Sequence, residues 1–316
     1  MAINPDSPPA QGTSFDPGLT QKYTQGLKRM INPDGRFNVR RTGATWRDFH
    51  PYLFLVDAPL PIFLGVILVG YFVGNLVFAG IYWAIGVEHL HGTAAATPFL
   101  TFVNAFFFSA HTLTTVGYGN FYPEGVLANT VAALEALVGL MTFALGTGIL
   151  FGRFSRPSAR IGYSKRMVIA PYRETTSLQF RIVNRRPNNL LNLQAQVLLM
   201  TVQLGNGLPR RKFDILQLER DSVIFFPLPW TIVHPITETS PLYGKTPEDF
   251  SRLQVEVLIM IKAIDETFGQ LVHSRFSYRF DEIEWGAKFA PVFDVEASGD
   301  LLLELNRVSE IERLLG

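Results

Sequence analysis

Thr114-Thr115-Val116-Gly117-Tyr118-Gly119-Asn120 is the stretch that decides how this chain folds. It directly follows residues 97–111, an apolar and aromatic run that begins with Thr97-Pro98. That run is shorter than the roughly 20 residues that cross a bilayer, and threonine followed by proline is a common helix start. We therefore expect a re-entrant helix over residues 98–112, followed by irregular backbone that contains two glycines.

The sequence around this stretch is almost free of charge. Between Arg47 and Arg153 lie 105 consecutive residues without a Lys or Arg, and they hold only five acids. Soluble domains carry charge on about a quarter of their residues, so this region needs the bilayer as its solvent. Residues 58–87 and 127–152 are each long enough to span it. We predict transmembrane helices at about 58–86 and 126–152, the alternative for each being a buried helix of a soluble protein.

Basic residues flank the two predicted spans and are absent between them. Because cytoplasmic flanks are enriched in Lys and Arg, both termini are expected in the cytoplasm. The flanking basic residues are Lys22, Lys28, Arg29, Arg36, Arg40, Arg41 and Arg47 before the first span, and Arg153, Arg156, Arg160, Lys165 and Arg166 after the second.

Irregular backbone at membrane depth is tolerated only inside protein or along a wet cavity. Glycine permits the backbone angles that turn successive carbonyl groups toward one axis. Thr115, Val116, Gly117, Tyr118 and Gly119 match the selectivity filter of potassium channels residue for residue, in which rings of oxygens replace the hydration shell of K⁺. A single copy cannot enclose an ion, so the motif predicts a homotetramer that holds K⁺ ions. The alternative is a chance glycine turn.

Further motifs indicate which channels the chain resembles. They are Trp46-Arg47-Asp48, Phe106-Phe107-Phe108-Ser109, Arg153-Phe154-Ser155-Arg156-Pro157, Trp230-Thr231-Ile232-Val233-His234-Pro235-Ile236, Ser240-Pro241-Leu242-Tyr243-Gly244 and Asp281-Glu282-Ile283-Glu284-Trp285-Gly286. Over roughly residues 45–295 the chain resembles the bacterial branch of the inwardly rectifying potassium channels. The resemblance implies a membrane α + β fold, in which a two-helix pore is followed by an immunoglobulin-like cytoplasmic β-sandwich. It also implies location in a bacterial inner (plasma) membrane.

The pattern beyond the second span agrees with a β-sandwich. Short alternating or apolar runs separated by turn residues are typical of such sandwiches. The runs are 178–183, 195–204, 222–226, 253–264 and 272–278, and the expected turns include Asn206-Gly207 and Phe268-Gly269-Gln270. The predicted divisions are a disordered cytoplasmic segment (1–44), an interfacial helix (45–57), the pore (58–155) and the cytoplasmic domain (156–316).

The parts that would open and close the pore are expected in a helix at the cytoplasmic membrane surface before the first span and along the second span. Residues 46–56 can form an interfacial helix with Asp48 as N-cap, which resembles the slide helix of the family, although an ordinary linker helix is the alternative. Gly139 resembles the family's hinge glycine, but packing glycines are equally common in membrane helices. Phe151 matches the family's gate, where four rings could stop ions by dewetting. A core or lipid-facing phenylalanine is the alternative.

Two titratable residues are expected behind the filter. Glu135 is the one acid in the second span, and intramembrane carboxylates are functional candidates by default. We expect it to support the filter rather than bind ions, with Asn129 as a possible partner. His111 stands where the family often has Glu. A neutral His111 could donate a hydrogen bond behind the filter, or its charge could titrate near neutral pH. The alternative is a buried histidine whose hydrogen bonds are satisfied and which has no switching role.

Basic residues at the membrane surface are candidates for contact with anionic lipid head groups. The alternative is that they only fix the topology. The candidates are Trp46, Arg47, Arg153, Arg156, Arg160, Lys165, Arg166, Arg185 and Arg186, the last two through the resemblance. Pro187 follows them where the family often has a basic residue, which argues against specificity for phosphoinositides.

Strong rectification in this family depends on acids that line the pore and hold polyamines or Mg²⁺. The matching positions here are Phe143, Asn192 and Lys262, and none is acidic. Four Lys262 ammonium groups near the ion path would repel polyvalent cations. We therefore expect weak block by polyamines or Mg²⁺, with Gly269 also counted among the pore-lining positions.

Other function classes find little support in the sequence. The net charge of +1 argues against general nucleic-acid binding, and the lack of cysteine removes thiolate chemistry. Gly146-Thr147-Gly148 follows no strand, and there is no phosphate loop or His-Glu-x-x-His motif. An enzyme is therefore not expected. The remaining alternatives are a membrane sensor of the same fold that does not conduct, and a weakly selective cation channel in which Asn120 and Glu124 shape the outer mouth.

Overall fold

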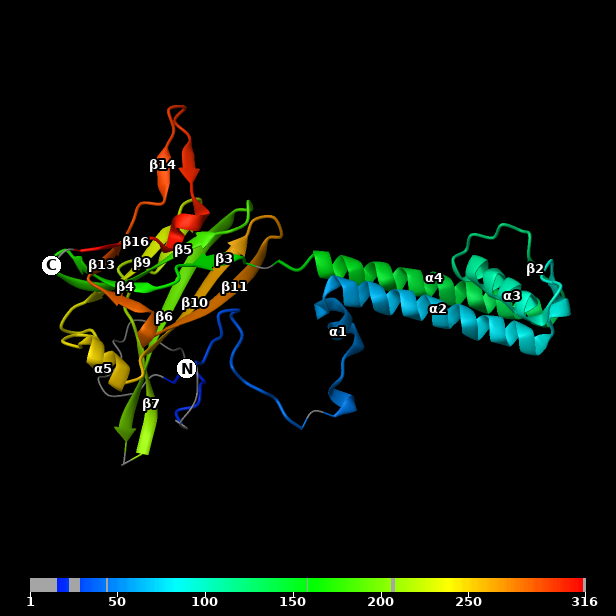
Figure 1. Cartoon of the computed structure of the whole chain (residues 1–316), viewed down its shortest axis with the longest axis horizontal. Helices are drawn as coiled ribbons and strands as arrows, with labels where there is room; N and C mark the ends of the chain where they lie inside the picture. Colours follow the sequence, from blue (N-terminus) through cyan, green and yellow to red (C-terminus); the bar gives the residue numbers. More distant parts are fainter. Residues whose placement is uncertain (1–15, 23–28, 44, 158, 206–207, 315–316) are drawn as a thin grey trace, which may run out of the picture. The chain divides into compact units, whose positions relative to one another are not determined.

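The computed structural model describes residues 16–22, 29–43, 45–157, 159–205 and 208–314, in two compact units. One unit, the membrane unit, is Arg41–Arg156. The other, the β unit, combines the residues up to Arg40 with those from Pro157 onward. Figure 1 labels most of the helices and strands of both units.

Two long apolar helices dominate the membrane unit. α2 (Leu60–Ile85) and α4 (Val126–Phe154) have mean hydropathies of 2.3 and 1.8, and each is long enough to cross a membrane. The shorter α3 (Pro98–Leu113) packs against both of them, and Figure 1 shows α2 and α4 side by side with α3 against one end of the pair. The minor elements η2 (Val87–His89), β1 (Leu90–His91) and β2 (Tyr122–Pro123) complete the connections at that end.

The start of α3 follows the expected capping pattern. The Thr97 side chain accepts a hydrogen bond from the Leu100 N–H, and Pro98 occupies the first turn, where its missing N–H costs no helical bond. At the other end the Thr114 N–H donates to the Ala110 carbonyl at 3.2 Å. The helix therefore delivers the chain directly into the glycine-containing stretch.

The interfacial segment is a short turn followed by a helix, rather than one helix over residues 45–57. The turn is η1 (Trp46–Asp48), and α1 (Pro51–Asp57) follows after His50, whose backbone is extended. The predicted role of Asp48 as N-cap of this helix is wrong, because its carboxylate accepts hydrogen bonds from the Thr45 N–H and hydroxyl. Proline disfavours helical geometry in the residue before it, so the helix starts at Pro51 itself.

Two five-stranded sheets form the body of the β unit. The first has the order β11 (Gln270–Arg279), β10 (Glu256–Asp265), β6 (Leu190–Gly205) and β7 (Leu208–Ile215), with β8 (Ser222–Phe225) also paired to β6. The second has the order β12 (Ile283–Trp285), β4 (Met167–Tyr172), β5 (Thr175–Asn184) and β3 (Ile161–Tyr163), with β9 (Trp230–Ile236) also paired to β5.

The hydrophobic core lies between these sheets and follows the alternation of side chains along the strands. On β5 the alternate residues Leu178, Phe180 and Ile182 are buried, and β6 and β10 repeat the pattern from the other sheet. A period of two is what a sheet with one covered face requires. The five strand-like runs of the sequence overlap β5, β6, β8, β10 and β11.

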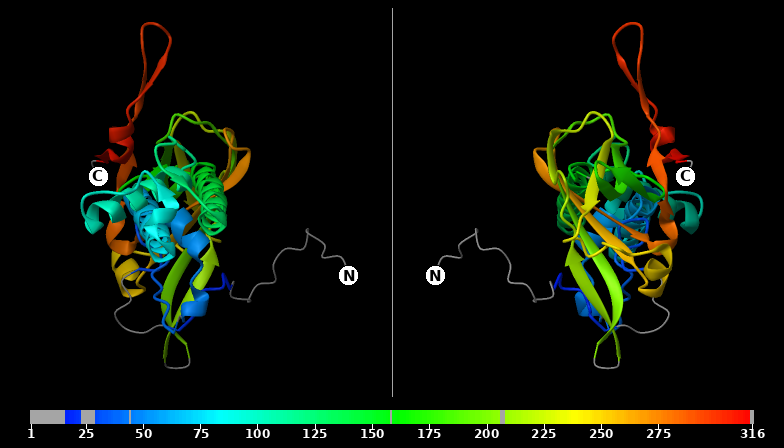
Figure 2. Two further views of the ribbon diagram at one scale, coloured as in Figure 1. Left: turned by 90° about the vertical axis from the view of Figure 1, so that its right-hand side faces the viewer. Right: turned by 90° about the vertical axis from the view of Figure 1, so that its left-hand side faces the viewer.

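Smaller elements extend the β unit. They include three short helices, α5 (Pro247–Arg252), η3 (Phe280–Glu282) and η4 (Leu305–Ser309). They also include two antiparallel strand pairs, β13 (Ala287–Phe289) with β16 (Ile311–Arg313) and β14 (Phe293–Val295) with β15 (Leu301–Leu303). Figure 2 shows the β14–β15 pair, in orange-red, projecting away from the two sheets. The expected turn at Gly269 connects β10 and β11 with φ +61°, whereas the turn at residues 206–207 lies outside the described residues.

The predicted disorder of residues 1–44 does not hold for residues 29–38. Ile31 is 4% exposed and packs in a cluster with Met200, Phe213 and Leu258 of the first sheet. The Ser277 hydroxyl donates to the Ile31 carbonyl at 2.9 Å. The segment as a whole is polar, so its composition did not indicate that the apolar Ile31 packs against the sheet. Residues 1–15, for which disorder was also predicted, lie outside the described residues.

The buried His234 is expected to make the stability of the β unit depend on pH. The His234 Nδ1–H donates to the Gln217 carbonyl at 2.6 Å, and the Ser240 hydroxyl donates to Nε2 at 2.8 Å. Burial lowers the pKa of His234 below its ordinary value of 6.5. As the pH falls below 6.5 the unfolded chain therefore takes up this proton first, and the free energy of unfolding decreases.

Urea titrations monitored by the fluorescence of Trp230 and Trp285 measure this effect. We expect His234→Gln, whose amide can still donate to Gln217, to lose part of the decrease in unfolding free energy between neutral and mildly acidic pH. Equal pH dependence in the wild type and the variant would contradict this assignment.

Candidate functional site

The backbone of the filter stretch has an alternating conformation. Thr115, Gly117 and Gly119 have φ values of +59°, +58° and +80°, whereas Val116 and Tyr118 between them are not among the residues with positive φ. Alternation between left-handed and right-handed regions points successive carbonyl groups to the same side, whereas an ordinary strand points them to opposite sides. Left-handed geometry at a β-branched threonine costs about 1–2 kcal/mol, so the surroundings must impose it.

Backbone hydrogen bonds from the end of α3 hold this conformation. The Val116 and Gly117 N–H groups both donate to the His111 carbonyl, at 2.9 and 3.3 Å, and the Thr115 N–H donates to the Thr112 carbonyl at 3.0 Å. Irregular backbone at membrane depth requires such partners within the protein. The position of α3 therefore fixes the first half of the filter.

His111 contacts the filter through its ring as well as its carbonyl. The ring lies nearly perpendicular to the Tyr118 ring with centroids 4.9 Å apart, and it stacks on Phe121 at 6.1 Å. The ring contacts recorded for His111 are aromatic ones, which support Tyr118 from behind. A hydrogen bond from the His111 ring and its titration both stay predictions.

Glu135 connects the helices α2, α3 and α4 of the membrane unit. Its carboxylate accepts a hydrogen bond from the Tyr82 hydroxyl at 2.7 Å and contacts the Ser109 hydroxyl, which also contacts the Asn75 side-chain oxygen. These residues come from α2, α3 and α4. The sequence alone did not point to Asn75, Tyr82 or Ser109 as partners of Glu135, because they are 26 to 60 residues away along the chain.

The suggested partnership of Asn129 with Glu135 is wrong. The Asn129 amide donates instead to the Gly125 carbonyl at 2.7 Å and to the Pro123 carbonyl at 3.3 Å. Six residues on an α-helix correspond to a rotation of about 240°, which places the two side chains on different sides of α4.

Gly139 lies one turn beyond Glu135 and makes a second close contact with α3. A Cβ atom at Gly139 would collide with the carbonyl oxygen of Leu113. By contrast, a Cβ at Gly146 or Gly148 would meet no atom within 4 Å in the described chain. This geometry favours a packing role for Gly139 over a hinge. The α3–α4 contact thus has two supports, Ser109 with Glu135 and Leu113 with Gly139.

The two phenylalanines expected along the pore are exposed in the single chain. Phe143 and Phe151 are 75% and 73% exposed, and they lie a little over two turns apart on α4. A buried core position is therefore wrong for both rings, which are available to face other copies of the chain, lipid or a water-filled path.

Arg153 and Arg156 connect the end of α4 to α1. The Arg153 guanidinium donates to the carbonyls of Leu55 and Val56, at 2.5 and 3.1 Å, and lies 4.8 Å from the Phe63 ring centroid. Arg156 forms an ion pair with Asp57. Both arginines, predicted as lipid contacts, are thus partnered within the protein.

The other predicted lipid contacts are mostly exposed. Trp46 is exposed with the Arg47 guanidinium 5.7 Å from its ring centroid. In the β unit, Arg166 pairs with Glu284, which also binds Arg313 at 2.9 Å. The exposed residues there are Arg160, Lys165, Arg166 and Arg185, and Arg186 is half-buried.

Asn192 and Lys262 line one groove on the first sheet of the β unit. Asn192 has φ +50° and occupies a β-bulge, where the register between β6 and β10 shifts between Lys262 and Ile264. Gln194, Ser222 and Leu271 line the same groove. Asn192 and Lys262, two of the three expected pore-lining positions that hold no acid, are therefore neighbours. No cluster of three His, Asp or Glu side chains that could bind a metal ion occurs in the part of the chain that the structure describes.

Comparisons with known proteins agree on the identity of both units. The family model "Inward rectifier potassium channel C-terminal domain" matches residues 161–314, and the model "Ion channel" matches residues 66–156. The chain is 36% identical over 289 residues to the inward rectifier potassium channel Kirbac3.1 of Paramagnetospirillum magnetotacticum, covering 90% of this chain and 95% of that protein. The chain belongs to the inward rectifier potassium channel family.

More distant members of the family are also similar over most of the chain. The chain is 28% identical over 314 residues to the G protein-activated inward rectifier potassium channel 3 of Mus musculus, covering 90% of this chain and 78% of that one. This inward rectifier therefore has the family's two membrane-spanning helices followed by a β-sandwich, and its relatives are ion channels rather than enzymes.

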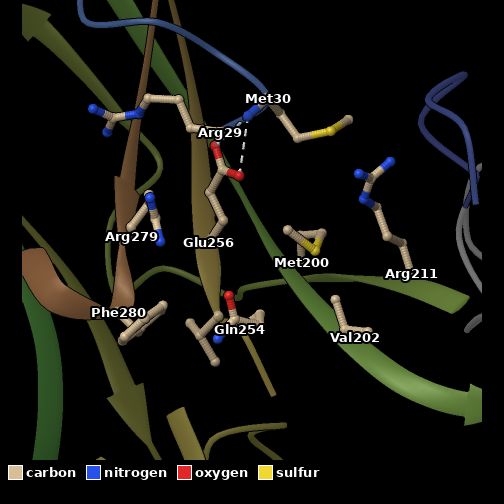
Figure 3. A pocket seen from close by; sticks show the side chains of 10 residues that line it. Arg29, Met30, Met200, Val202, Arg211, Gln254, Glu256, Arg279 and Phe280 are labelled. Carbon is tan, nitrogen blue, oxygen red and sulfur yellow. Dashed lines mark hydrogen bonds between the residues drawn. The ribbon is translucent and has the colours of Figure 1, made fainter. Parts of the chain in front are cut away.

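In this inward rectifier the segment before the membrane unit is anchored to the β unit at a small pocket. Figure 3 shows the Met30 N–H directed at the carboxylate of Glu256, 2.9 and 3.1 Å from its two oxygens. Arg29 beside it binds Glu282 at 2.8 Å and contacts Ser277. Burial raises the pKa of Glu256 above its ordinary value, and hydrogen bonds from Ser277 and Met30 oppose that rise. The sequence did not lead us to predict this anchor. The signal that could have indicated it is Glu256, an acid at the start of the apolar strand β10.

Substitution of Gly139 tests whether it packs or bends. We expect Gly139→Ala to push α4 away from Leu113 and to destabilise the filter end of the inward rectifier by about 1–3 kcal/mol, as overpacked sites do. Thermal unfolding of the purified protein measures this loss, and Gly146→Ala, at an open position of the same helix, is the matched control. If both alanine variants unfold at the wild-type temperature, the packing role is wrong.

Proposed function

We propose that the chain forms a homotetramer that conducts K⁺ passively and selectively across a bacterial inner (plasma) membrane, with both termini in the cytoplasm. The alternating backbone of Thr115–Gly119 is the observation that carries this proposal. One such segment presents its carbonyl groups to one side only, so four copies around an axis are needed to surround an ion.

In this proposal K⁺ is the cargo, and the chain supplies its coordination. The carbonyl oxygens of Thr115 to Tyr118 and the Thr115 hydroxyl take the place of the hydration shell. The C-terminal, partially negative end of α3 favours cations near the start of the filter. His111, behind Tyr118, and Glu135, between the helices, act as supports rather than as ligands.

The gate of the proposed channel lies on α4. Phe151 rings from four copies form the constriction, which stops ions by excluding water, and Phe143 lines the path on the filter side of it. Arg153 and Arg156 connect this end of α4 to α1. Movement of α1 in the membrane surface therefore shifts the gate, with Gly139 fixing the opposite part of α4 against α3.

Anionic lipids modulate this coupling in the proposed mechanism. Basic side chains near a cytoplasmic membrane surface gain about 1 kcal/mol each from anionic head groups. Trp46 and Arg47 stand next to α1 and are exposed. The candidates in the β unit are Arg160, Lys165, Arg166, Arg185 and Arg186.

The groove with Asn192 and Lys262 faces the cytoplasmic ion path, together with the turn at Gly269. Four lysines there repel polyvalent cations, so polyamines and Mg²⁺ block weakly.

The proposed roles divide the chain at residues 44, 57 and 155, into a cytoplasmic segment, an interfacial segment, the pore and the cytoplasmic domain.

Flux of ⁸⁶Rb⁺ into K⁺-loaded liposomes tests the proposed conduction. We expect uptake that Ba²⁺ blocks, that external K⁺ suppresses and that external Na⁺ leaves unchanged. Gly117→Ser is expected to abolish it, because an L-residue at φ +58° strains the filter backbone. Gly146→Ser, on α4 with open space around it, is the matched control.

Two results would contradict the proposal and favour its alternatives. Equal competition by Na⁺ and K⁺ would indicate a weakly selective cation channel. No uptake under any lipid condition, from a protein shown to be a folded tetramer, would favour a non-conducting sensor of the same fold.

Reversal of the charge at Lys262 tests the proposed cytoplasmic ion path. We expect micromolar spermine to block wild-type currents weakly, and Lys262→Asp to strengthen voltage-dependent block by about tenfold or more, because four carboxylates would attract the polyamine. Lys245→Asp, at an exposed turn position, is the control and should change little. Strong spermine block of the wild type, or no effect of Lys262→Asp, would place this groove away from the path.

A further inference from the structure

Four polar side chains form a closed cluster inside the membrane unit. Asn75 and Tyr82 come from α2, Ser109 from α3 and Glu135 from α4, and none is more than 1% exposed. This burial is complete within one chain, so assembly into a tetramer does not add to it. The protons available inside the cluster can therefore be counted.

The count leaves the cluster one proton short if Glu135 is ionised. The three contacts are Tyr82 hydroxyl with Glu135 Oε2 at 2.7 Å, Ser109 hydroxyl with Glu135 Oε1, and Ser109 hydroxyl with Asn75 Oδ1 at 3.0 Å. Each contact needs one proton between its two oxygens. Tyr82 and Ser109 supply one proton each, and an ionised carboxylate supplies none.

Asn75 cannot supply the missing proton. Its amide nitrogen donates to the Tyr71 carbonyl at 2.7 Å, which fixes the amide with its oxygen toward Ser109. The opposite orientation would place the amide oxygen against the Tyr71 carbonyl oxygen, two acceptors facing each other. The third proton must therefore be on Glu135.

The charges around the cluster lead to the same conclusion. The membrane unit has no Lys or Arg between Arg47 and Arg153, and every identical copy shares this lack. The nearest titratable group on α3, His111, contacts Tyr118 and Phe121. The groups bonded to the Glu135 carboxylate are the Tyr82 and Ser109 hydroxyls. An ionised carboxylate buried in a membrane without a cation is strongly unfavourable.

We propose that Glu135 is held as an un-ionised carboxylic acid that donates its proton to Ser109, which in turn donates to Asn75. The Tyr82 hydroxyl donates to the carbonyl oxygen of the same acid. This chain of hydrogen bonds makes Glu135 a positioning residue, since it fixes α3, whose His111 carbonyl holds the Val116 and Gly117 N–H groups. The effect on conduction rests on the proposed function, whereas the protonation state does not.

Infrared spectroscopy of the full chain in liposomes tests the protonation state directly. At neutral pH we expect the wild-type spectrum minus the Glu135→Gln spectrum to contain the carbonyl stretch of an un-ionised acid, with the downshift in D₂O that such acids show. Subtraction separates the signal of Glu135 from that of any other un-ionised acid in the chain. Glu124→Gln, at an exposed acid 3.4 Å from His91, is the matched control and should leave the band in place.

A second variant keeps the test decisive if Glu135→Gln does not fold. Tyr82→Phe removes one hydrogen bond to the acid's carbonyl, so the band should shift to higher frequency and persist. Absence of the band from the wild type, or a band unchanged in both variants, would overturn the proposal.

Rescue by an amide gives a functional readout. A glutamine at position 135 can accept from Tyr82 and donate to Ser109, as the acid does, so Glu135→Gln should retain tetramer stability and most of the ⁸⁶Rb⁺ uptake. Glu135→Ala should lose both. Loss of both in Glu135→Gln as well would indicate that the charge is required and would overturn the proposal. If the wild type shows the infrared band but takes up no ⁸⁶Rb⁺, only the proposed conduction is contradicted, and the protonation state of Glu135 stands.

Discussion

Irregular backbone within a membrane must find all its hydrogen-bond partners inside the protein, and the membrane unit is arranged around this constraint. The filter stretch is not helical, since Thr115, Gly117 and Gly119 have positive φ. Its first N–H groups are instead bonded to the His111 and Thr112 carbonyls at the end of α3. Everything that positions α3 thereby positions the filter.

Two contacts of different kinds hold α3 against α4. One is polar and buried, between Ser109 and Glu135, and the other is a close backbone approach that only glycine at position 139 permits. Both lie on one face of α4, one turn apart. Beyond them α4 carries exposed Phe143 and Phe151 and ends in arginines bonded to α1. The same helix therefore connects the filter support to the proposed gate.

The fold class was predictable from the sequence because its signals are local. A charge-free stretch of 105 residues indicates the bilayer, and side-chain alternation indicates the sandwich. Details that depend on contacts between distant residues were missed. Glu135 bonds to Tyr82, 53 residues away, whereas the suggested Asn129 lies nearby on the same helix but on a different side. The anchor at Arg29–Ile31 depends on Glu256 and Ser277, more than 220 residues away.

The central claim is that the Thr115–Gly119 backbone selects K⁺, and the reversal potential of single channels in a planar bilayer tests it most directly. With K⁺ on one side and Na⁺ on the other, the account predicts a reversal potential far from zero, in the direction set by K⁺ alone. It also predicts that this potential collapses in a filter variant that still conducts. A wild-type reversal potential near zero would contradict the account, because it would show that the oxygens of this filter do not distinguish the two ions.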